Sequence, residues 1–190
     1  MSDPFDDLRL TTEQFQEFLE KFTQHVSSFL ADRQEKDYMP TLLIQTKQFP
    51  EMATQHTFVC FATDFNEGEQ KRRLMMGMGC KIYEQHQIPV AIALASEAWM
   101  SQQSEDQWQR KMMPRDDPRR VEIIVVSAMT LDRSQKGMRH ARIQRDAQNH
   151  IALPEAFSAI ITDVKCGILE HFFHGYLLAA EAGIQKGGKR

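Results

Sequence analysis

Cys166, Glu170 and His174 follow one another at intervals of four residues near the end of the chain. On a helix this spacing would bring a thiol, a carboxylate and an imidazole to one face, and zinc and related metals accept all three as ligands. Asp163 and Glu181 extend the same polar side of the predicted helix. Because a solvent-facing polar stripe explains this spacing without a ligand, we expect no metal ion and no cofactor.

A second group of chemically capable residues surrounds the polar stretch 101–119. Glu97 and Trp99 end an apolar segment before it, and Arg119 and Arg120 follow at its end. A carboxylate at a strand end beside a loop with arginines could form a pocket for a small ligand or a hydrolytic site. The same residues could instead form an ion pair between Glu97 and Arg119 or Arg120 on the adjacent strand. We favour the ion pair and keep the pocket as the alternative.

Basic side chains cluster around a strand predicted near residue 140. They are Arg133, Lys136, Arg139, Arg142 and Arg145. Such a cluster could contact the phosphates of a nucleic acid, but basic residues on an edge strand also prevent edge-to-edge aggregation. The formal net charge is −3, and the sequence contains no known nucleic-acid-binding motif. We therefore favour the protective role and do not expect a nucleic acid partner.

Several function classes leave no trace in the sequence. The phosphate-binding patterns GxxxxGK[ST] and GxGxxG, the zinc-protease pattern HExxH and the hydrolase pattern GxSxG are all absent. The three cysteines, Cys60, Cys80 and Cys166, are widely spaced and odd in number, which fits reduced thiols in the cytoplasm. We expect no signal peptide and no membrane contact, because no apolar run approaches the ~18 residues of a membrane span.

The elements that must position these residues follow from the apolar patterning. Thr11 and Gln14 have capping-box spacing before an apolar helical stripe, so a first helix should extend to about Lys36. Gly77 and Gly79 lie inside a second predicted helix, where we expect close backbone packing. The remaining elements are strands at 41–46 and 57–62, a helix that begins at Asp64 or Asn66 and ends near His86, and strands at 90–99 and 121–131. Gly137 should form the turn into a fifth strand at 140–144, and a last helix should run from Pro154 to about Gly183.

The last predicted helix has two apolar sides. Phe157, Ile161, Val164, Ile168 and Phe172 form its main stripe, and a second strip lies about 130° away around the axis. The second strip consists of Leu169, Phe173, Leu177 and Ala180. One sheet cannot cover both strips, so either the first helix or a second copy of the chain covers the second one. We expect homodimerisation through Leu169, Phe173 and Leu177.

These elements predict one α+β domain over residues 1–186, with a disordered tail at 187–190. A mostly antiparallel five-stranded sheet should be flanked by helices in the order α-β-β-α-β-β-β-α. The run Glu97 to Met100, followed by Asp117 to Glu122, resembles a motif of uncharacterised prokaryotic and phage proteins. The element order is similar to that of profilin-like folds such as roadblock and longin domains, and that resemblance implies dimerising scaffolds and regulators.

The sequence therefore favours a non-enzymatic interaction or regulatory module of bacterial or phage origin. We expect it to act in the cytoplasm as a homodimer that can also bind another protein. The alternatives are a small-ligand or hydrolytic enzyme around Glu97 and a phosphate or nucleic-acid contact through the basic fifth strand.

Overall fold

The computed structural model describes residues 8–32, 36–48, 51–61, 68–101, 116–153 and 155–187. Its elements, in chain order, are helix α1 (Thr12–Asp32), strands β1 (Thr41–Gln48) and β2 (Ala53–Cys60), helix α2 (Gly68–Glu84), strands β3 (Gln87–Met100), β4 (Val121–Thr130), β5 (Lys136–Arg142), β6 (Gln144–Arg145) and β7 (Ile151–Ala152), and helix α4 (Gly167–Gly187). This is the predicted α+β fold with the order α-β-β-α-β-β-β-α, to which β6 and β7 add a small hairpin.

The main sheet has five strands in the order β2-β1-β3-β4-β5, and all neighbours are antiparallel. β3 and β4 are internal strands, as their apolar character on both faces predicts. Pro89 lies within β3, opposite Thr46, where the register with β1 shifts by one residue. A proline is tolerated at such an irregularity because the ladder is already interrupted there.

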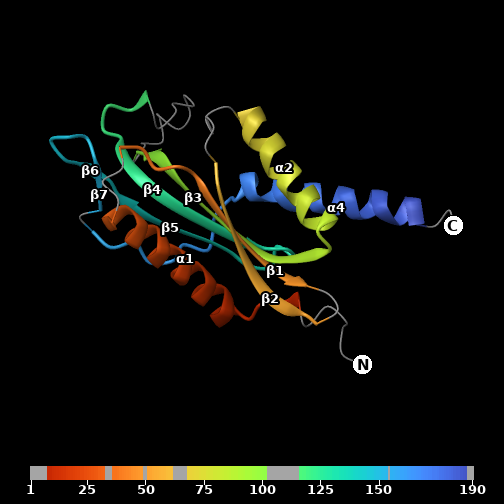
Figure 1. Cartoon of the computed structure of the whole chain (residues 1–190). Coiled ribbons are helices and arrows are strands. Elements are labelled where there is room, and N and C mark those ends of the chain that lie inside the picture. Colours follow the sequence, from red (N-terminus) through yellow and green to blue (C-terminus); the bar gives the residue numbers. More distant parts are fainter. Residues whose placement is uncertain are drawn as a thin grey trace.

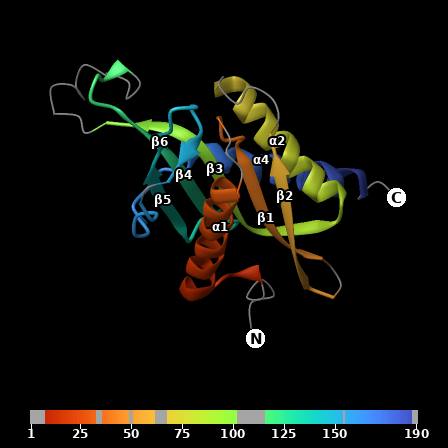
Figure 2. The ribbon, with the colours of Figure 1, turned by 60° about the vertical axis from the view of Figure 1, so that its left-hand side comes forward.

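Helices cover both faces of the sheet, with α1 on one face and α2 and α4 on the other (Figures 1 and 2). Side chains alternate between two cores along β3. Ala91, Ala93 and Ala95 face the α1 side, whereas Ile92 and Leu94 face α2 and α4. Because the alanines are small, the large side chains of α1 can lie close to the sheet. These buried residues of α1 are Phe15, Phe18, Leu19, Phe22, Val26 and Leu30.

α1 begins with the predicted capping box. The Thr11 N–H donates to Gln14 Oε1 at 2.9 Å, and the Gln14 N–H donates to Thr11 Oγ1 at 3.2 Å. The described part of the helix reaches Asp32, residues 33–35 of the expected extension lie outside the described residues, and Lys36 is not helical. The Tyr38 ring is buried edge-on against Phe29, with 6.1 Å between the ring centroids.

α2 and α4 pack against each other across their glycines. Gly79 of α2 has no room for a side chain, which confirms the predicted close packing at that position. Gly77 faces open space, so the same prediction is wrong there. Cys80 Sγ also donates to the Gly175 carbonyl of α4 at 3.2 Å. Asp64 and Asn66, the two predicted starts of this helix, lie outside the described residues, and α2 ends at Glu84.

The start of the last helix is the main correction to the sequence-based fold. α4 begins at Gly167, not at 154–155, and it includes Gly187, the first residue of the predicted tail. Residues 155–166 instead follow the outer edge of β5, where Met138 and Ile161 exchange two backbone hydrogen bonds of 2.9 Å. Pairing with the free β5 edge satisfies the backbone of this segment, and its β-branched residues favour an extended chain.

The predicted strand boundaries differ by a few residues from the observed ones, and Gly137, expected in a turn, lies inside β5 opposite Ala128. β1 and β2 reach further into the turn between them than expected, and Ala62 lies outside the described residues. None of the helices in the described part of the chain is both long and apolar enough to span a membrane.

Candidate functional site

The two edges of the main sheet differ in protection. β5 carries Lys136, Arg139 and Arg142, and residues 155–166 cover part of its outer edge. β2 pairs only with β1 among the described strands, and none of its eight residues is charged. Exposed edge strands usually carry charges, proline or a covering segment, because their unpaired backbone groups attract other strands. Among the residues that the structure describes, no strand pairs with the outer edge of β2, whereas part of the β5 edge is covered.

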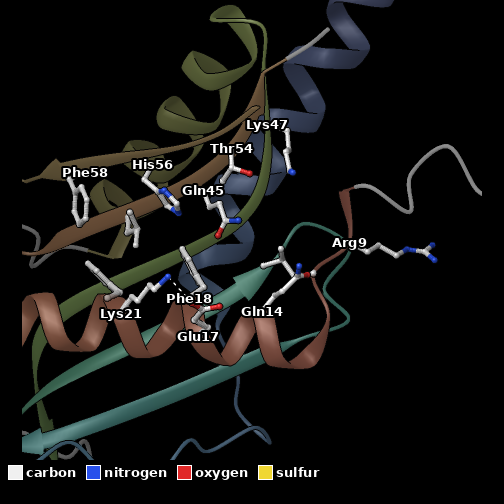
Figure 3. A pocket seen from close by; sticks show the side chains of 13 residues that line it. Arg9, Gln14, Glu17, Phe18, Lys21, Gln45, Lys47, Thr54, His56 and Phe58 are labelled. Atoms are coloured by element: carbon white, nitrogen blue, oxygen red, sulfur yellow. Dashed lines mark ion pairs between the residues drawn. The ribbon is translucent and has the colours of Figure 1, made fainter. Parts of the chain in front are cut away.

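A groove runs between α1 and this edge. α1 lies mainly over β3 and β4 and covers the inner face of β1 and β2 only in part: Leu43 is buried, whereas Thr54, His56 and Phe58 are exposed (Figure 3). The cavity has a volume of about 450 Å³. We call it the α1–β2 groove. Its lining residues are Arg9 and Leu10, then Gln14, Glu17, Phe18, Lys21 and Phe22 of α1, Leu43, Gln45 and Lys47 of β1, and Thr54, His56 and Phe58 of β2.

The floor of the groove changes character along the strands. Leu43 lies opposite Phe58, Gln45 opposite His56, and Lys47 opposite Thr54. These pairs share one face of the sheet, because alternate residues of a strand point to the same side. The floor is therefore apolar at one end and basic or polar at the other.

Aromatic side chains form the apolar end. The Phe58 side chain is 49% exposed, although its ring lies 6.3 Å from that of Phe22 and 4.7 Å from that of His25, measured between centroids. A phenylalanine exposed to this extent beside a cavity is a surface that a ligand can cover. We regard this end as the apolar anchor site of the groove.

The rest of the groove carries more positive than negative charge. Arg9, Lys21 and Lys47 contribute cations, and Glu17 is the one carboxylate among the lining residues. Lys21 Nζ lies 2.7 Å from Glu17 Oε1, and this hydrogen bond lowers the pKa of Glu17. Burial and the charge of Lys21 lower the pKa of His56, which favours its neutral imidazole.

The predicted pairing of Glu97 with Arg119 or Arg120 is wrong. Glu97 lies next to Arg145 of β6 instead, with 3.3 Å between Oε2 and Nη2, and its other oxygen accepts a hydrogen bond from the Tyr38 N–H. The reason is the hairpin of β6 and β7, which folds back over the end of β3 and β4 (Figure 1). An ion pair does hold Glu97 in place, as expected, but with a partner distant in the sequence.

Arg145 joins two carboxylates. Its guanidinium donates to Glu122 through two hydrogen bonds of 2.8 Å, in addition to its contact with Glu97. Burial raises the pKa of Glu97, opposed by the Tyr38 N–H and by Arg145, while the nearby Glu122 raises it further. Both Glu97 oxygens are engaged, so the cluster ties β3, β4 and β6 to the residues after α1.

The other members of the predicted ligand pocket lie beside this cluster. The Arg120 guanidinium stacks 4.7 Å above the ring of Trp99. Arg119 contacts Asp117, with 3.3 Å between Nε and Oδ1. The structure does not pair either arginine with Glu97, and residues 102–115 of the predicted pocket loop lie outside the described residues.

The basic residues near β5 make internal contacts. Arg139 pairs with Glu20 of α1 and donates to the Ser158 carbonyl at 2.7 Å. Lys136 Nζ lies 3.3 Å from Glu170. Together with Arg145, these residues hold the chain's own elements together. The alternative of a phosphate contact through the fifth strand stays a prediction. Because Lys136, Arg139 and Arg145 are paired within the chain, fewer cations remain to bind phosphate.

The residues considered for a metal ion do not converge. Cys166 is buried before α4, with its thiol directed at the Ala128 carbonyl, and burial raises its pKa. Glu170 pairs with Lys136, and His174 is exposed on α4. Within the described ranges, no group of three or more His, Cys, Asp or Glu side chains could hold a metal.

The predicted dimer strip is divided between core and surface. Leu169 and Phe173 are fully buried among residues of α2, α4 and the sheet, because α2 covers the side of α4 that was expected to be free. Leu177 is 44% exposed. The apolar strip therefore gives no separate reason for a second copy at Leu169 and Phe173.

Sequence reasoning missed the α1–β2 groove. One signal was available: β2 alternates Thr54, His56 and Phe58 on one face without a charge anywhere in the strand. Comparison of the chain with protein-family models, with curated protein sequences and with solved structures gave no match. The function must therefore be argued from this geometry.

Proposed function

We propose that this chain is a non-enzymatic interaction module that binds an extended segment of a partner protein in the α1–β2 groove. The observation that carries this proposal is the uncharged strand β2, whose outer edge pairs with no other described strand, beside a groove with an exposed aromatic end. Strand addition at an open edge is a common mode of peptide recognition, in which backbone hydrogen bonds supply affinity and side-chain pockets supply specificity.

The backbone of β2 supports this mode. In an antiparallel pair, every second residue directs both its N–H and its C=O away from the neighbouring strand. β2 has eight paired residues, so about half of them present these groups at the outer edge. A segment bound there would lie along the outer side of β2, with alternate side chains on the face of the sheet that carries Thr54, His56 and Phe58.

Selected peptides test the proposal. Random nonapeptides displayed on phage are selected on the immobilised chain, and a fluorescent copy of a selected peptide is titrated by anisotropy. His56→Pro and Thr57→Pro change adjacent positions, of which one directs its N–H toward β1 and the other outward. Proline at the position whose N–H points outward should keep the fold and weaken peptide binding at least tenfold. His56→Ala is the control for loss of the side chain. If both proline variants fold and bind the peptide as tightly as the parent chain does, strand addition is contradicted.

A second copy of the chain is the competing occupant of the β2 edge. Sedimentation velocity over a range of concentrations separates the two cases. We expect a monomer that binds the selected peptide. A dimer that the outward proline variant dissociates would assign the edge to self-association and overturn the proposal of a partner segment.

We also propose the cytoplasm of a bacterial or phage-infected cell as the setting. Cys60, Cys80 and Cys166 are all free thiols, and a reducing compartment keeps thiols in this state. The reducing compartment matters for the β2 edge, because Cys60 is exposed at the end of β2. A disulfide formed at Cys60 would obstruct that edge.

A further inference from the structure

We infer that the α1–β2 groove selects an acidic segment with one apolar anchor residue, a step that rests on the proposed function. The anchor would bind at the Phe58 end. Carboxylates would follow at the second and fourth positions from it, directed toward His56 and Lys21 and then toward Lys47. The juxtaposition of an aromatic end and a basic end along one open strand leads to this assignment.

The spacing follows from the geometry of the floor. Phe58, His56 and Thr54 are alternate residues of β2 and point to the same side. An added strand would match this repeat, since cross-strand neighbours on one face lie opposite one another. Successive ligand side chains on the groove side are therefore two residues apart, or roughly 6.6 Å.

The anchor preference follows from Phe58 and its neighbours. The Phe22 ring lies 6.3 Å from that of Phe58, Leu43 lies opposite Phe58 in the sheet, and Phe58 is half-exposed beside the cavity. An aromatic or large aliphatic side chain placed there would remove apolar surface from water on both molecules, which favours binding. Figure 3 shows Phe58 at the end of the groove opposite to Lys47 and Arg9.

The preference for acidic residues follows from the charge of the lining. Lys21 is paired with Glu17, and Arg9 Nε lies 3.9 Å from Asp132 Oδ2, so Lys47 carries the surplus positive charge of the lining. Glu17 is already engaged by Lys21, so a ligand carboxylate nearby would extend an existing ion pair. A basic ligand would instead meet Lys21 and Lys47 as like charges, which opposes binding.

Matched heptapeptides test the inference. The reference peptide has Phe at its second position, Asp at its fourth and sixth, and Thr elsewhere, and its sequence is also made in reverse to cover both strand directions. One control replaces both Asp by Lys, and another replaces Phe by Ala. We expect the better of the two acidic orders to bind at least tenfold more tightly than its Lys version at low salt, and at least fivefold more tightly than its Ala version. High salt should reduce the preference for Asp over Lys but not the preference for Phe over Ala, because salt screens only the charge interactions.

Variants of the chain locate the selectivity. Lys47→Glu should reduce the preference for the acidic peptide at least fivefold. Lys165→Glu makes the same charge change in the exposed segment beside β5 and should leave the preference unchanged. Circular dichroism of both variants checks that they fold.

The outcomes separate the two proposals. Equal binding of the acidic, basic and Ala-containing peptides, all lost in the outward proline variant of β2, would overturn the inference and leave strand addition standing. Failure of every heptapeptide and every selected nonapeptide to bind the folded chain would overturn the proposed function itself. An equal loss of acid preference in Lys47→Glu and Lys165→Glu would also overturn the inference, because the effect would then come from net charge.

Discussion

Gly79 of α2 lies so close to Phe172 of α4 that a Cβ at Gly79 would overlap the Phe172 carbonyl oxygen and lie 2.7 Å from the Tyr176 nitrogen. Gly175 makes the reciprocal approach to the backbone of Met76. The two helices thus contact each other through their backbones. This contact lets them cover one face of the sheet together (Figure 2).

Gly79→Ala should therefore destabilise the fold. Forcing an extra carbon into a packed contact costs about 1 to 3 kcal/mol. Gly77→Ala is the matched control two residues away, where a Cβ meets nothing within 4 Å, so the better helix propensity of alanine should add up to about 1 kcal/mol. Urea unfolding of both variants measures the difference. Equal effects of the two substitutions would contradict the close helix contact.

Arg145→Met should destabilise the chain by about 2 kcal/mol, less than the cost for a fully buried charge because these side chains are 20–25% exposed. The loss arises because Glu97 and Glu122 then face each other without a cation. The double variant Arg145→Met with Glu122→Gln should recover part of this stability. Thermal unfolding of Arg145→Met, Glu122→Gln and the double variant completes a double-mutant cycle. If the stability changes of the two single variants simply add in the double variant, the cluster is contradicted.

The raised pKa of Glu97 predicts a pH effect. A carboxyl with a higher pKa in the folded state binds its proton more tightly there. Its contribution to the free energy of unfolding therefore falls as pH rises from about 4.5 through the folded pKa. Glu97→Gln removes this titration. The variant should match the parent near pH 4 and become relatively more stable toward pH 7. A stability difference between the two proteins that is independent of pH would contradict the raised pKa.

Arg139→Ala should release the segment that covers β5. Arg139 ties β5 to Glu20 of α1 and to the carbonyls of residues 157 and 158, and its side chain is only 14% exposed. Hydrogen exchange at the amides of Met138 and Ile161 should become faster, because their mutual hydrogen bonds depend on this cover. Arg142→Ala, at an exposed position of the same strand, is the control and should leave that exchange unchanged.

The core was largely predictable because helix and strand patterns depend on local periodicity. The capping box at Thr11, the apolar stripe of α1 and the internal positions of β3 and β4 all follow from residues close together in the chain. The start of α4 did not follow. Phe157, Ile161 and Val164 have helical spacing, but hydrogen bonds to β5 hold this segment extended, and those bonds depend on tertiary structure.

The candidate sites were harder to predict for the same reason. Glu97 and Arg145 are 48 residues apart in sequence, and only the fold of the β6–β7 hairpin brings them together. The α1–β2 groove depends on where α1 lies across the sheet. The helical stripe of α1 determines which of its faces is buried, but not which strands that face covers.

Protection of only one edge limits how far chains of this kind could assemble. A fibre of stacked sheets needs two open edges on every chain, one that accepts a strand and one that offers the next. Here residues 155–166 occupy part of the edge of β5, so pairing through β2 uses the open edge and leaves no equivalent one. Further pairing through this sheet is therefore limited to the partly covered β5 edge, so β2 can stay uncharged with less risk of polymerisation.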